Sequence, residues 1–146
     1  MKFTLLTGRI LFSLIFLMTL MSHFSSQSIE YAAASGVPLA NIAVPFSGII
    51  AALGALSIMT GYKAKLGAWL VVLFLIPVTF TMHNFWTISD PMARQMQMVM
   101  FMKNISIMGG ALIVSYFGSG PLSLGESIEE KKENFSSQTS KAQIAA

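Results

Sequence analysis

Four long apolar runs, separated by short polar segments, constrain this chain more than any other feature. The runs cover about residues 4–24, 40–60, 66–86 and 95–117. An α-helix needs roughly 20 predominantly apolar residues to cross the hydrocarbon core of a bilayer, and each run has that length. A membrane β-barrel would instead need segments of about ten residues that alternate apolar and polar positions. The pattern therefore predicts an all-α integral membrane protein, with four spanning helices bundled within residues 1–118.

The composition excludes several functional classes. Of the 146 residues, 54% are hydrophobic and 10% are charged, whereas a soluble domain usually has about 25% charged residues. The net charge of +3 comes from scattered basic residues, so the basic patch that nucleic-acid binding requires is not expected. The chain has no cysteine, which excludes disulfides and thiol chemistry. The paired His and intervening Glu of a helical zinc site are also missing, so no metal site is expected.

The first apolar run has a second interpretation as a signal peptide, which begins with charge and ends at small residues. The small residues 32–35 could serve as a cleavage region. Two features favour a retained span instead: the apolar stretch is longer than that of a typical signal peptide, and Arg9 interrupts its start. We therefore expect the first run to form the first helix of the bundle.

The distribution of Lys and Arg predicts the orientation, because short cytoplasmic loops carry an excess of both. One side of the predicted bundle has a single basic residue, Arg94. The basic residues of the other side are Lys2, Arg9, Lys63, Lys65, Lys131, Lys132 and Lys141. We therefore expect a multi-pass protein with both termini in the cytoplasm.

Two segments outside the spans have their own patterns. Residues 28–34 favour a short helix on the outer side, between the first and second spans, ended by Gly36 and Pro38. Residues 119–146 are polar and mixed in charge, which predicts a disordered cytoplasmic tail.

Polar side chains inside the predicted spans are the candidate functional residues, because charge there is costly and usually faces the bundle interior. Arg9 either faces that interior or extends to the cytoplasmic headgroups, and Asp90 is expected to cap the fourth helix. The candidate ligand-binding residues are Arg9, His23, His83, Asn84, Lys103 and Asn104. No catalytic residue is predicted.

Lys103 and Asn104 lie side by side in the fourth run and allow two interpretations. In the first, they form an internal hydrogen-bonded lock between helices, with Lys103 reaching an outer carboxylate such as Asp90 or Glu30. In the second, they line a polar pocket that opens toward the outer side. The other residues of that pocket would be His23, His83 and Asn84.

Several short motifs together resemble the DoxX family of small bacterial membrane proteins, over about residues 5–124. They are Gly8-Arg9, Gly36-Val37-Pro38, Gly61-Tyr62, Gly67-Ala68-Trp69 and Lys103-Asn104. The resemblance implies a four-helix bundle in the bacterial inner membrane, in the role of a redox-complex subunit that binds quinone or a similar apolar ligand. The chain itself would be at most a non-catalytic or quinone-binding subunit of an oxidoreductase.

The expected partners are the lipid bilayer and membrane or redox proteins, with an oligomer also possible. The alternative function is a non-enzymatic membrane assembly or interaction protein, in which the polar residues only lock the helices together. A transporter or channel would need an oligomer, because four spans leave little space for a pore.

Overall fold

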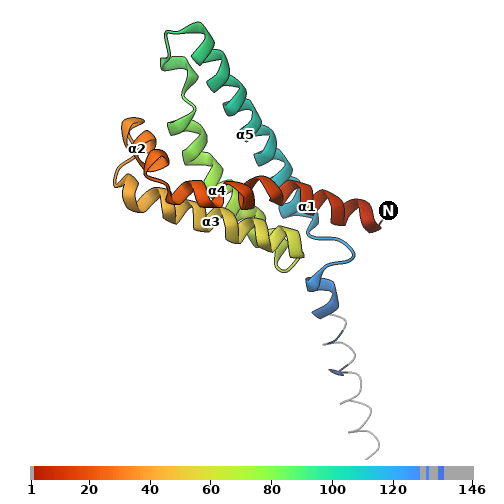
Figure 1. The fold of residues 1–146 in the computed structure, drawn as a ribbon. Coiled ribbons are helices and arrows are strands. Elements are labelled where there is room, and N and C mark those ends of the chain that lie inside the picture. The colour runs from red at the N-terminus through yellow and green to blue at the C-terminus, as the bar shows by residue number, and fades with distance from the viewer. Residues whose placement is uncertain (1, 129–130, 132–134, 137–146) are drawn as a thin grey trace, which may run out of the picture.

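The computed structural model describes residues 2–128, 131 and 135–136, and this part of the chain is helical with no strands (Figure 1). This confirms the all-α class. The elements in order are α1 (Lys2–Thr19), η1 (Leu20–Phe24), α2 (Ser26–Ala34), α3 (Ala40–Thr60), α4 (Ala64–Met82), η2 (Phe85–Thr87) and α5 (Pro91–Phe117).

Four helical segments are long and apolar enough to cross a membrane, as the sequence predicted. They cover Phe3–Phe24, Ala40–Thr60, Ala64–Thr87 and Pro91–Phe117. The fourth helix begins at Pro91, ahead of the apolar run at about residue 95, and the predicted cap is confirmed, because the Asp90 carboxylate accepts the backbone N–H of Ala93 at 2.7 Å. The predicted short outer helix is α2, whose first turn is capped by the Ser25 hydroxyl.

The helices run alternately between two ends of the bundle. We call the end that holds the N-terminus, the α3–α4 turn and the end of α5 the inner end, and the end that holds α2 and the α4–α5 connection the outer end. The most extensive helix contacts join α3 to α4, α4 to α5 and α1 to α3. Figure 1 shows that α4 and α5 rise away from α1 and α2 toward the α4–α5 connection. The outer ends of α4 and α5 therefore diverge from α1, α2 and α3.

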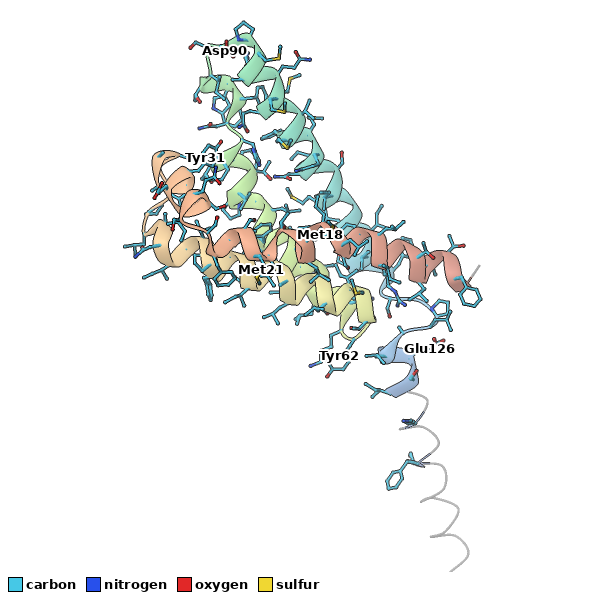
Figure 2. All side chains as sticks on the ribbon, viewed as in Figure 1. Met18, Met21, Tyr31, Tyr62, Asp90 and Glu126 are labelled. Carbon is cyan, nitrogen blue, oxygen red and sulfur yellow. The ribbon has the colours of Figure 1, made fainter. Side chains whose placement is uncertain are left out.

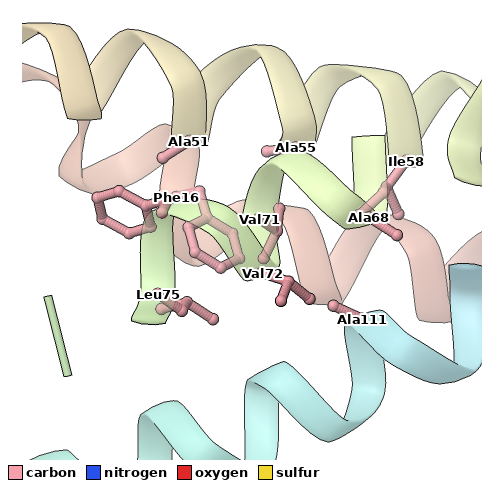
Figure 3. Close-up of a cluster of buried hydrophobic side chains, with 10 residues drawn as sticks. Phe16, Ala51, Ala55, Ile58, Ala68, Val71, Val72, Leu75 and Ala111 are labelled. Carbon is pink, nitrogen blue, oxygen red and sulfur yellow. The ribbon is translucent and has the colours of Figure 1, made fainter. Parts of the chain in front are cut away.

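Small residues hold α3 and α4 close together, which is how helices associate in lipid. Ala55 of α3 and Ala68 of α4 are fully buried in the core cluster of Figure 3, as is Val71. The contact is closest at Gly67, where an added Cβ would lie 2.7 Å from the Gly54 carbonyl oxygen. Small residues of α3 and α4 thus make the surface along which the two helices pack.

Arg9 binds the chain that follows α5. Its side chain is 5% exposed and donates from Nη1 to the Ser119 carbonyl at 2.9 Å and from Nη2 to the Leu122 carbonyl at 2.6 Å. Ser123 is buried nearby, against the α3–α4 turn at Gly61. The first residues of the predicted tail therefore pack against the inner end of the bundle.

The predicted disorder of residues 119–146 falls partly outside the described residues, at 129–130, 132–134 and 137–146. Over 119–128 the structure places the chain against the inner end, where Arg9 binds the Ser119 and Leu122 carbonyls, and the disorder of the tail stays a prediction. The division of the chain at residue 118, and the cytoplasmic position of both termini, stay predictions.

Candidate functional site

Two adjoining pockets lie in the outer half of the bundle. The larger, which we call the α2 pocket, has a volume of about 610 Å³ and is lined by residues of η1, α2, α3 and α4 and of the α2–α3 connection. The smaller, which we call the polar pocket, has a volume of about 240 Å³ and lies between α1, η1, the C-terminal half of α4 and α5. The two pockets share Ser22, His23 and Val78. They therefore adjoin at η1 and α4, in the region where α4 and α5 diverge from the other helices.

The α2 pocket is mostly apolar, with polar groups concentrated on η1 and α2. Its apolar lining is Ala32, Val37, Ala43, Val44, Phe46, Pro77, Val78 and Met82. Gln27, Ser28 and Tyr31 add an amide and two hydroxyls from α2, and Tyr31 is labelled in Figure 2. A concave apolar site with a few placed polar groups is typical of small-molecule and peptide binding. The sequence did not predict this pocket, because its walls come from four separate elements.

The polar pocket brings together four of the six predicted site residues, namely His23, His83, Lys103 and Asn104. The arrangement matches the polar pocket that was one of the two interpretations of Lys103 and Asn104. Its remaining walls are mostly apolar. The binding role of the four predicted residues stays a prediction. No group of three or more His, Cys, Asp or Glu residues in the described part of the chain could hold a metal ion.

Arg9 and Asn84 lie outside both pockets. Arg9 is at the inner end, bound to the backbone after α5. Asn84 precedes η2, and its carbonyl accepts hydrogen bonds from the backbone and the hydroxyl of Thr87. Its position next to His83 in the sequence did not place it in the same site, because the chain turns into η2 at that point.

Consecutive hydrogen bonds link three side chains at the outer side of this region. His83 Nδ1 lies 2.7 Å from Gln97 Oε1, and Gln97 Nε2 donates to the Tyr31 hydroxyl at 3.1 Å. In the tautomer that carries a proton on Nδ1, His83 donates this hydrogen bond to the Gln97 amide oxygen. These hydrogen bonds join α2, the residue that follows α4, and helix α5. Gln97 was absent from the predicted site, although it lies seven residues, about two turns, before Asn104 on one face of the helix.

The His23 side chain is positioned by a contact within its own helical segment and by Gly48 of α3, which has no side chain. Its Nδ1 lies 2.9 Å from the Thr19 carbonyl oxygen, and its ring lies 5.7 Å from the Phe74 ring, centroid to centroid. An added Cβ at Gly48 would come within 2.6 Å of the His23 Cβ. Gly48 therefore makes the space in which His23 separates the two pockets.

In the described part of the chain Lys103 bonds within its own helix, so the lock between helices that was its other interpretation stays a prediction. Its Nζ lies 3.4 Å from the Met100 sulfur, one turn earlier on α5. A thioether is a weak acceptor and carries no charge. Asp90, one of the expected carboxylate partners, caps α5 instead.

Comparison with known proteins assigns the chain to a family. A model of the SURF4 family matches residues 1–135. The chain belongs to the SURF4 family. It is also similar to the ER-derived vesicles protein ERV29 of Saccharomyces cerevisiae, with 31% identity over 88 residues. The match covers 60% of this chain but 27% of ERV29, so this SURF4-family chain spans about a quarter of that relative's length. No solved structure matches the chain.

The SURF4 assignment corrects three predictions. The resemblance to DoxX is wrong, because the family model that matches the chain is that of SURF4. The redox-subunit function, with the oxidoreductase and quinone that it implied, is wrong for the same reason. The bacterial inner membrane is also wrong, because the relative is a yeast protein of ER-derived vesicles. The bilayer remains a partner, and redox partners have no support.

Proposed function

We propose that this chain is a membrane protein of ER-derived vesicles that binds another protein through the α2 pocket. The proposal takes its location from the name of the yeast relative. It takes its mode of action from one observation, the 610 Å³ pocket beneath α2. This is the interaction-protein alternative of the sequence analysis, now given a site.

The chemistry of the pocket favours an extended segment of a protein partner. Val44, Phe46 and Met82 offer contacts for apolar side chains. Gln27 and Tyr31 offer an amide and a hydroxyl, which can meet the backbone groups that such a segment would otherwise bury unpaired. Pockets of several hundred Å³ are large enough to enclose most of a small ligand's surface.

The charge pattern predicts which partners can reach the pocket. The outer end is the side poor in Lys and Arg, and this side of a membrane protein faces away from the cytoplasm. In a vesicle that side is the lumen. The partner is therefore a lumenal protein, or the lumenal part of a membrane protein, that travels in the same vesicle.

Photocrosslinking from the pocket tests the proposal. A photoreactive amino acid at Val44, inside the pocket, is expected to crosslink a protein that added protease cannot reach in sealed vesicles. The matched control is Leu53 on the same helix, which is 55% exposed and lines neither pocket. Its protein crosslinks should be several-fold fewer. Equal protein crosslinks from both positions, or products at Val44 that the protease removes, would contradict the proposal.

A further inference from the structure

We infer that the polar pocket is a binding site for the anionic headgroup of a membrane amphiphile, whose phosphate or carboxylate oxygens pair with Lys103 and Asn104. This goes beyond the proposed function, which uses the α2 pocket.

Lys103 carries a charge that the spans do not balance. The four spanning segments contain no Asp or Glu, and their basic residues are Arg9, Lys65, Arg94 and Lys103. Lys103 lies about 18 Å along α5 from Pro91, at 1.5 Å per residue, and farther still from Phe117. A cation near the middle of a spanning helix is costly unless it is paired. Its contact within the described residues is the uncharged Met100 sulfur.

Asn104 provides an independent sign of a ligand. Its side chain is 5% exposed and lines the polar pocket. Within residues 2–128 the amide makes no hydrogen bond. Buried amides are normally paired, so an unpaired one is expected to bind a group that the chain does not supply. The Asn104 amide and the Lys103 ammonium are both donors, and donors converging on one pocket favour an acceptor with several oxygens.

The walls of the pocket indicate where the anion comes from. Ile15, Phe74 and Ile107 are apolar, and each belongs to a spanning segment. A soluble anion and a lipid headgroup would both lose water to enter, but the apolar chain of a lipid adds contacts with these walls. Paired with an ammonium away from water, a phosphate or carboxylate forms a strong charge-assisted hydrogen bond. An anionic lipid therefore fits both the donors and the walls.

The test is native mass spectrometry of the full chain in mild detergent, with three probes added separately. The probes are oleate, phosphatidic acid and, as a neutral control, phosphatidylcholine. We expect wild type to retain oleate, phosphatidic acid or both over phosphatidylcholine. Oleate alone would identify a free carboxylate as the ligand, and phosphatidic acid alone would identify a phospholipid headgroup.

Two variants separate this site from general attraction to positive charge. Lys103→Met should weaken retention by roughly tenfold or more, because it removes the charged donor of the proposed charge-assisted hydrogen bond. Lys103→Arg should retain the lipid, because it keeps the charge. The matched control Arg94→Met changes a basic residue of the same helix that lines neither pocket, and it should bind as wild type does. Equal retention of all three probes, retention of none, or unchanged binding by Lys103→Met would overturn the inference.

Discussion

Gly67→Leu is expected to separate α3 from α4 and to leave little folded protein. An added Cβ at Gly67 would lie 2.5 Å from the Ser57 Cβ and 2.7 Å from the Gly54 carbonyl oxygen. Overpacking a core usually costs about 1–3 kcal/mol. The cost here should reach or exceed the top of that range, because one of the opposing groups is backbone and cannot rotate away. Thermal unfolding in detergent, followed by size-exclusion chromatography of the heated sample, measures the loss.

The control for Gly67→Leu is Gly109→Leu on α5, where an added Cβ would have nothing within 4 Å. Both changes add the same side chain to a spanning helix, so effects on membrane insertion and helix propensity cancel. Gly109→Leu should stay within about 0.5 kcal/mol of wild type. If the two variants were equally stable, the close contact of α3 and α4 would be incorrect.

Arg9→Met is expected to release residues 119–128 from the inner end of the bundle. The change removes two charge-assisted hydrogen bonds, to the carbonyl oxygens of Ser119 and Leu122. Bonds to charged groups contribute roughly 1.5–3 kcal/mol each, although the relief of burying the guanidinium offsets part of the loss. A glutamate-specific protease should therefore cut at Glu126 several-fold faster in the variant than in wild type.

Arg9→Lys sharpens that measurement. One ammonium keeps the charge but lacks the planar fork that reaches two carbonyl oxygens at once. Its cleavage rate should fall between those of wild type and Arg9→Met. Arg94→Met, at the exposed start of α5, removes a positive charge far from this contact and should leave the rate unchanged. Wild-type cleavage of Arg9→Met would show that Arg9 does not hold the segment.

The spanning helices could be predicted because their signal is local. Continuous apolar runs of membrane-crossing length give the same answer whatever their neighbours are, and the first turn of α5 follows from Asp90 and Pro91 alone. The polar pocket was partly predictable as well. Polar residues in a span tend to face the bundle interior, so Lys103 and Asn104 had a limited choice of surroundings.

The long-range hydrogen bonds and the α2 pocket could not be predicted. They depend on which helices become neighbours, and the periodicity of a sequence does not contain that information. Gln97 binds Tyr31 from 66 residues away, and Arg9 binds the Ser119 carbonyl from 110 residues away. The α2 pocket exists because α2 folds back toward α3 and α4. The family could not be predicted from short motifs for a related reason. The motif Gly67-Ala68-Trp69 lies at a close helix contact, which many membrane bundles need. Such a motif therefore says little about function.

The central claim, that this SURF4-family chain travels in ER-derived vesicles, is tested most directly by a budding reaction. ER membranes that contain the tagged chain are incubated with cytosol and nucleotides, and the released vesicles are separated from the donor membranes. The measurement is the fraction of the chain in the vesicles, compared with that of a membrane protein resident in the ER. The account predicts severalfold enrichment of the chain over the resident protein. Equal, low recovery of both would contradict it.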